Sequence, residues 1–88
     1  MKLKIDRSFE KDTDKLNNPQ VLQKVAVCIT QVIAAHTIAS ISNIKKLSGF
    51  KYHYRIRIGD YRVGVVIKND KITFERFLHR KDIYKYYP

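Results

Sequence analysis

The stretch that decides the fold is Tyr52–Arg80, which reads YHYRIRIGDYRVGVVIKNDKITFERFLHR. Apolar and polar residues alternate through most of it, and turn residues interrupt it at Gly59-Asp60 and Asn69-Asp70. Such alternation is typical of strands with one buried face, and such dipeptides are typical of tight hairpin turns. The stretch therefore predicts an antiparallel meander of strands over residues 52–58, 61–67 and 71–78.

The turns also predict which residues face each other. If both loops are two residues long, Ile58 pairs with Tyr61, Lys68 pairs with Lys71, and Gly64 lies opposite Glu75. A bulge or a longer loop would shift this register. In this register one face carries apolar side chains, with Arg76 as its misfit, and we expect it to be the core face: Tyr54, Ile56, Ile58, Tyr61, Val63, Val65, Ile67, Ile72, Phe74 and Leu78.

The opposite face of the predicted sheet is strongly basic. Its members are His53, Arg55, Arg57, Arg62, Gly64, Glu75, Phe77 and His79. Like charges that face each other on a sheet are destabilising, so the three arginines need an anion, either Glu75 or a ligand. The planar guanidinium group suits phosphate, and Gly64 leaves a gap where a bound group could approach the backbone.

The flanking segments complete an α+β fold. Residues 1–5 alternate as a short edge strand, residues 8–16 predict a helix with Ser8 as its candidate cap, and residues 19–36 predict a longer helix. Asn18 should cap that longer helix, with Pro19 in its first turn. Its apolar stripe is expected to comprise Leu22, Val25, Ile29 and Val32 or Ile33. Residues 37–51 are read as a connection, and the end of the chain as one helical turn or an irregular tail. The predicted order is β-α-α-β-β-β, with a helical hairpin packed on a twisted, mostly antiparallel sheet.

Composition limits the possible functions. The 88 residues predict a single domain, 1–88, and the net charge of +10 favours a polyanionic partner: nucleic acid, an anionic membrane surface or an acidic protein. The lone Cys28 excludes an internal disulfide, suits a reducing cytosol and lies in an apolar pattern typical of a core residue. The chain shows no signal peptide and no transmembrane run, so we expect a cytoplasmic protein with no membrane-spanning segment. Of the three polyanions we expect nucleic acid or an acidic protein as partner, and no membrane.

The residues on the basic face are compatible with RNA chemistry. No metal-ligand spacing, glycine-rich phosphate loop or nucleophile elbow occurs, so no metal or cofactor is expected. In RNA cleavage a base removes the 2′ proton, an acid protonates the leaving 5′ oxygen, and arginines stabilise the charge at phosphorus. His53, His79 and Glu75 are the side chains able to move protons near neutral pH. Taken alone, the residues predict RNA binding and leave cleavage open.

Lysines and tyrosines outside the meander allow two readings each. Lys45, Lys46 and Lys51 either contact phosphates beside the arginines or lie on a solvated loop. Tyr84 and Tyr86, with Tyr87, either stack on bases or pack the tail onto the body of the protein.

The motifs together resemble the RelE/ParE superfamily of bacterial toxins. They are Leu47…Gly49, Tyr54-Arg55-Ile56-Arg57, Asp60-Tyr61-Arg62-Val63 and His79-Arg80-Lys81-Asp82-Ile83-Tyr84. The resemblance spans nearly the whole chain. It implies a toxin of a type II toxin–antitoxin system that an antitoxin neutralises, and that antitoxin is expected to be acidic and to wrap the toxin. Members that resemble RelE cleave mRNA in the ribosomal A site without metal, whereas members that resemble ParE inhibit DNA gyrase.

The resemblance also suggests residue roles. Arg62 matches the phosphate-binding arginine, and Arg80 and Tyr84 match a catalytic arginine and a tyrosine that stacks on the mRNA base. Arg55 and Arg57 stand where RelE has lysines, one of them implicated as the base, so His53, Glu75 or His79 would have to replace it. Arg57, Arg62, His79, Arg80 and Tyr84 form the candidate catalytic set and favour the ribonuclease branch. A gyrase inhibitor, or an inactive toxin that only binds its antitoxin, is the alternative.

Overall fold

The computed structural model describes all 88 residues and contains one mixed sheet with helices on both sides. The sheet has the strand order β1-β5-β4-β3-β2, in which β1 is parallel to β5 and the remaining pairs are antiparallel. The elements are β1 Lys2–Ile5, α1 Arg7–Asp14, α2 Pro19–Ala34, a 3₁₀ turn Ile38–Ser40, β2 Ile44–Lys46, β3 His53–Ile58, β4 Tyr61–Lys68, β5 Lys71–His79 and α3 Ile83–Tyr86. The predicted α+β fold and the three-strand meander are confirmed.

The two predicted hairpin loops are present. Gly59 has a positive φ of 57°, and Ile58 pairs with Tyr61 across its loop. Asn69 and Asp70 have φ values of 52° and 62°, the left-handed pair that a type I′ turn requires, and Lys68 pairs with Lys71. Tight turns of this kind fix the register at the end of each hairpin.

A β-bulge in β5 corrects the predicted register farther from the turn. Val65 still pairs with Phe74, but Gly64 pairs with Arg76 rather than with Glu75, so Glu75 is an extra residue. Every residue after the bulge therefore moves to the other face. Phe77 is buried in the core, Leu78 packs on the opposite face, and Arg76 no longer has to be accommodated in the core.

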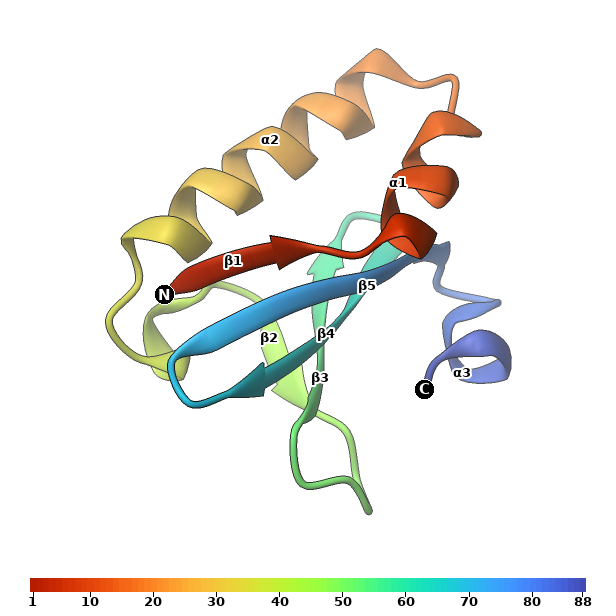
Figure 1. Cartoon of the computed structure of the whole chain (residues 1–88). Helices are drawn as coiled ribbons and strands as arrows, with labels where there is room; N and C mark the ends of the chain where they lie inside the picture. Colours follow the sequence, from red (N-terminus) through yellow and green to blue (C-terminus); the bar gives the residue numbers. More distant parts are fainter.

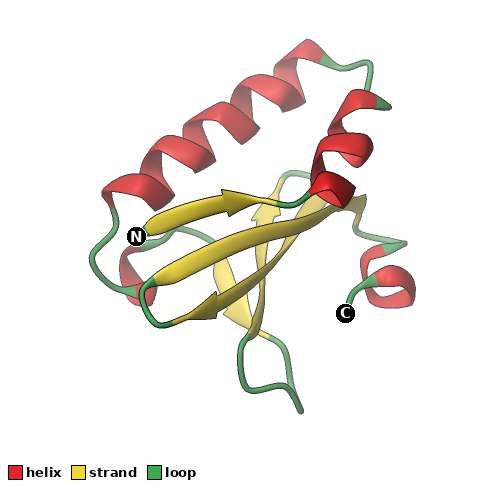
Figure 2. Cartoon of the chain, in the orientation of Figure 1, coloured by secondary structure: helices red, strands yellow, loops and turns green.

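The helices α1 and α2 form a hairpin over one face of the sheet, while α3 lies apart from them (Figures 1 and 2). The core between the hairpin and the sheet includes Val25, Cys28 and Val32 from α2 and Phe9 from α1. Leu22 was predicted to belong to this stripe, but it is exposed because α2 turns its Val25–Cys28–Val32 edge toward the sheet. Burial raises the pKa of the Cys28 thiol to about 11, in keeping with the predicted core role.

The helix caps and the connection differ in detail from the prediction. The Asn18 side chain accepts a hydrogen bond from the Val21 N–H at 3.2 Å, as predicted. Asp6 rather than Ser8 precedes α1, and its side chain makes no capping bond. The connection contains an additional short strand, β2, that pairs with β3. No helix of the structure is both long and apolar enough to cross a membrane.

Candidate nucleic-acid interface

Three arginines of β3 and β4 lie on the sheet face that the α1–α2 hairpin leaves open. Arg57 pairs directly with Arg62, and Arg55 pairs with Gly64, as the turns predicted. No carboxylate forms an ion pair with any of the three arginines. Because facing like charges repel, this arrangement costs stability and favours an anion above the sheet.

Arg62 lies at the centre of this group. Its Nη1 donates to the carbonyl oxygens of Gly59 and Tyr61, both at 2.9 Å, and these bonds hold the guanidinium beside the β3–β4 loop. Burial lowers the pKa of Arg62, and the charges of Arg55, Arg57 and Arg80 lower it further, while Tyr84 acts in the opposite direction. Strand pairing and the charge effects on Arg62 thus place four arginines and a tyrosine phenol near one another, and we call this group the arginine cluster: Arg55, Arg57, Arg62, Arg80 and Tyr84.

The loop between β5 and α3 brings Arg80 to this cluster. The Arg80 N–H donates to the Asp60 carbonyl oxygen at 2.7 Å, which ties the end of β5 to the β3–β4 loop. The Arg80 Nε lies 3.8 Å from Asp60 Oδ1, and both side chains are mostly exposed. An exposed ion pair of this length contributes little to stability, so Arg80 can exchange Asp60 for a phosphate.

The bulge places His79 away from the cluster, contrary to the prediction that it shares a face with Arg57 and Arg62. His79 pairs with Tyr61 and lies against the Tyr61 ring, with the ring centroids 5.5 Å apart. Its Nδ1 accepts a hydrogen bond from the Lys81 N–H at 3.1 Å. Both contacts orient the imidazole toward the hollow between α1 and α3 rather than toward the arginines.

His53 and Glu75 remain on the open face and lie close enough to influence each other. Burial raises the pKa of the Glu75 carboxyl, and the nearby His53 partly counteracts this rise. The Nδ1 atom of His53 is buried and has no hydrogen-bond partner. This pair therefore consists of a carboxyl with a raised pKa beside an imidazole, the kind of pair that acid–base catalysis uses.

The three C-terminal tyrosines take different positions. Tyr84 and Tyr86 are 64% and 61% exposed, whereas Tyr87 is 3% exposed. The Tyr87 ring covers Gly64, so the gap predicted there is filled by the protein itself. Tyr84 and Tyr86 are free to stack on bases, while Tyr87 takes the packing role. The sequence signal for the contact between Tyr87 and the backbone of β4 was Gly64, a glycine in the middle of a strand.

The three lysines do not share one surface. Lys45 pairs with Arg55 and therefore extends the basic face. Lys46 pairs with Tyr54 and faces the other way, and the Lys51 Nζ lies 5.4 Å from the centre of the Tyr52 ring. Lys46 and Lys51 border a hollow that also contains Tyr54, so of their two readings the contact beside the arginines does not hold.

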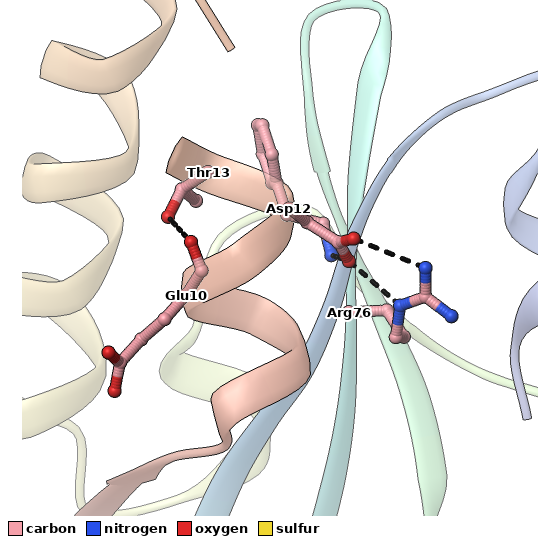
Figure 3. A network of polar contacts seen from close by, with 5 residues as sticks. Glu10, Asp12, Thr13 and Arg76 are labelled. Atoms are coloured by element: carbon pink, nitrogen blue, oxygen red, sulfur yellow. Dashed lines mark hydrogen bonds and ion pairs between the residues drawn. The ribbon is translucent and has the colours of Figure 1, made fainter. Parts of the chain in front are cut away.

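An ion pair that the sequence did not reveal holds the bulge. Asp12 of α1 accepts bonds from Arg76 Nε at 2.8 Å and Arg76 Nη2 at 3.2 Å (Figure 3). The same carboxylate accepts the Phe77 N–H at 2.9 Å. β1 pairs with β5 only as far as Phe74, so the Phe77 N–H lies on a free edge that Asp12 covers.

Comparisons with known proteins agree with this architecture. Residues 3–84 match a family model described as "ParE toxin of type II toxin-antitoxin system, parDE". The protein belongs to the RelE/ParE superfamily of type II toxins. It is 34% identical to Toxin RelE3 of Methanocaldococcus jannaschii over 89 residues, which cover the whole of both chains.

Two solved structures illustrate the shared fold of this toxin superfamily. A RelB–RelE antitoxin–toxin complex from Methanococcus jannaschii contains a chain with 32% identity and a TM-score of 0.82, covering 97% of this chain and 99% of that one. YafQ from Escherichia coli has 15% identity and a TM-score of 0.74, covering 93% and 96% of the two chains. The recognised family and fold are thereby confirmed.

Proposed function

We propose that this type II toxin is a metal-independent endoribonuclease that cleaves mRNA in the ribosomal A site and so inhibits translation. The observation that carries the proposal is the arginine cluster, in which Arg62 is surrounded by Arg55, Arg57 and Arg80 without a carboxylate partner of its own. A cleaving ribonuclease must stabilise the extra negative charge that develops on the phosphorus oxygens. Preorganised guanidinium groups supply that stabilisation and bind phosphate in the ground state as well.

The open face offers candidate groups for binding both the phosphate and a base. The RNA phosphate would bind Arg57, Arg62 and Arg80, and the exposed Tyr84 ring would stack on a base beside them. His53 and Glu75, the titratable pair on this face, lie beyond the Tyr87 ring, because His53 pairs with Val66 whereas Arg57 and Arg62 pair with each other at the other end of β3. We therefore propose that this pair meets a neighbouring nucleotide of the RNA rather than the phosphate at Arg62. In this scheme Arg55 and Lys45 contact flanking phosphates.

His79 takes a different part in this proposal. Its imidazole faces the hollow between α1 and α3, next to Tyr61 and the exposed Tyr86. We therefore assign to His79 a contact with a flanking nucleotide, together with Tyr86, rather than proton transfer at the phosphate bound by Arg62.

An antitoxin is the second proposed partner. The relatives from Methanococcus jannaschii and Pyrococcus horikoshii were solved as complexes of RelE with RelB. The net charge of +10 suits an acidic polypeptide that folds as it binds. An antitoxin that covered the arginine cluster would block phosphate binding. We propose that the toxin meets both partners, antitoxin and ribosome, in the cytoplasm.

The test is cleavage mapping of a defined mRNA on translating ribosomes, with new ends read by primer extension and naked RNA in parallel. Arg62→Ala should lower the cleavage rate by about 10²–10³-fold, the usual effect of removing one transition-state donor. Arg7→Ala, an exposed arginine of α1, removes the same charge and should cleave as the wild type does. Cuts at A-site codons that require ribosomes would support the proposal.

The alternative is a gyrase inhibitor, which the ParE description of the matching family favours. It predicts growth arrest accompanied by DNA damage while mRNA stays intact. A folded wild-type protein that cuts neither ribosome-bound nor naked RNA would overturn the ribonuclease proposal. Induction of the DNA-damage response would then identify a gyrase inhibitor, and its absence an inactive toxin.

A further inference from the structure

The Tyr87 ring lies directly on the backbone of β4. A Cβ built on Gly64 would be 2.7 Å from two atoms of this ring, closer than real Cβ contacts. The Tyr87 hydroxyl donates to the Val65 carbonyl oxygen at 2.5 Å, so the ring is held from both ends. Only glycine fits at position 64, and the reason is this contact rather than the backbone conformation.

The contact anchors a segment that has little stability of its own. α3 is four residues long, and so short a helix does not persist without tertiary contacts. Its buried side chain Ile83 forms a small cluster with Leu47, Leu78 and Tyr87, on the sheet face opposite the main core. The Tyr87 N–H donates to the Ile83 carbonyl oxygen at 2.8 Å, which closes the turn.

Tyr84 lies on the exposed side of this anchored turn. Ile83 is fully buried and Tyr84 is 64% exposed, so the burial of one residue fixes the direction of the next. The Tyr84 phenol is close enough to Arg62 to influence its pKa. If the turn moved, Tyr84 would leave the arginine cluster although the arginines of β3 and β4 stayed in place.

We propose that Tyr87 is a positioning residue, which by seating its ring on Gly64 holds the α3 turn so that Tyr84 meets the RNA base beside Arg62. This inference rests on the proposed ribonuclease function and adds a specific role to it. Tyr87 touches neither the phosphate nor the base. Tyr87 also packs beside His53, with ring centroids 5.8 Å apart. We assign its effect to Tyr84, which the comparison with Tyr84→Ala below tests, and its loss should affect the reacting geometry more than phosphate binding.

Two different substitutions each remove the contact between the Tyr87 ring and Gly64. Tyr87→Ala deletes the ring, and Gly64→Ala places a methyl group where the ring now lies. Because a misplacement of about 1 Å can reduce a rate by roughly 10²-fold, each variant should lower kcat by about that factor. KM should change little, since Arg57 and Arg62 still bind the phosphates. Tyr87→Phe keeps the ring and should retain most of the activity.

Double variants distinguish a loss of Tyr84 positioning from a general loss of structure. In a Tyr87→Ala background, Gly64→Ala should cause no further loss, because the added methyl group then has space. Tyr84→Ala should likewise cause no further loss in that background. Tyr52→Ala, a tyrosine removed far from the cluster, is the control and should cleave normally. Urea unfolding must show each variant to be folded under the assay conditions.

Amide hydrogen exchange provides a readout that needs no RNA cleavage. The Tyr87 N–H should be protected in the wild type, and exchange at residues 85–87 should accelerate in Gly64→Ala and in the double variant Gly64→Ala/Tyr87→Ala. Unchanged amide exchange at residues 85–87 in Gly64→Ala would show that the α3 turn does not depend on the Tyr87 ring packing on Gly64. Faster exchange with an unchanged kcat would overturn the positioning role. If the wild type cleaves no RNA, the proposed function fails, while the exchange data still decide whether Tyr87 holds the turn.

Discussion

Replacing Asp12 by alanine should destabilise the protein strongly, because this carboxylate accepts three hydrogen bonds at the bulge of β5. Two come from the Arg76 guanidinium, at 2.8 and 3.2 Å, and one comes from the Phe77 N–H at 2.9 Å. The side chain of Asp12 is only 9% exposed and that of Arg76 is 30% exposed. Water therefore cannot fully replace the lost acceptor.

The magnitude follows from what the substitution leaves behind. Losing a hydrogen bond to a charged group costs about 1.5–3 kcal/mol, and removing one partner of a buried ion pair costs about 3–5 kcal/mol. Because Arg76 is partly exposed and recovers some hydration, we expect a loss near the lower end, about 3 kcal/mol. For a domain of this size that loss lowers the Tm by roughly 12–24 °C.

Urea unfolding monitored by circular dichroism measures this change directly. Asp12→Asn keeps an acceptor for the Phe77 N–H and should lose about half as much as Asp12→Ala, about 1.5 kcal/mol. Asp14→Ala removes the same charge from an exposed position of the same helix and should have almost no effect. Equal unfolding free energies for Asp12→Ala and Asp14→Ala would refute the reasoning.

Three further predictions follow from the same structure. Burial raises the pKa of the Glu75 carboxyl in the folded protein above its ordinary value of 4.5. Between the unfolded pKa and this raised folded pKa, the folded state holds a proton that the unfolded chain releases. The free energy of unfolding therefore falls as the pH rises through that window. Glu75→Gln should therefore be more stable than the wild type at pH 7, with the difference disappearing below about pH 4; exposed Glu10→Gln is the control, and a variant less stable at pH 7 would contradict the sign. Gly59→Ala should cost about 1 kcal/mol, because its φ of 57° is strained for alanine although the added methyl group meets no atom, and urea titration measures this loss. With its pKa near 11 and its side chain buried, Cys28 should react with a thiol reagent at pH 8 only as fast as the protein opens, so labelling as fast as in urea-unfolded protein would disprove the burial.

The sequence and the structure agree where structure depends on neighbouring residues. Alternation and the dipeptides at Gly59-Asp60 and Asn69-Asp70 specify three strands and both hairpin loops, because side-chain period and turn geometry are local properties. The pairing of Arg57 with Arg62, on which the candidate site depends, follows from a single two-residue loop. Asn18 and Pro19 likewise mark the start of α2 correctly.

The assignment of Arg80 and Tyr84 to the site had a different origin. The meander register brings the end of β5 beside the β3–β4 loop, but only the resemblance to RelE/ParE toxins suggested that Arg80 and Tyr84 act with Arg62. In the structure the Arg80 N–H binds the Asp60 carbonyl, a contact that spans the meander. What the local rules do not specify is the turn after Arg80, which the burial of Ile83 and Tyr87 sets.

The bulge at Glu75 shows most clearly what tertiary structure alone decided. Phe77 and Leu78 are adjacent and both apolar, so alternation could not tell which of them enters the core. The choice depends on Asp12, which lies 64 residues before Arg76 and binds both Arg76 and the Phe77 N–H. That one-residue shift buried Phe77 and turned His79 away from the arginines.

The sequence by itself therefore determined the fold class, the meander and the basic face of this toxin, because these arise from charge, periodicity and turns. Tertiary structure decided which titratable side chains share that face, and it decided that Tyr87 rather than a ligand occupies the space over Gly64. Both outcomes depend on contacts between distant segments. Their free energy comes from packing and buried hydrogen bonds, which no local pattern encodes.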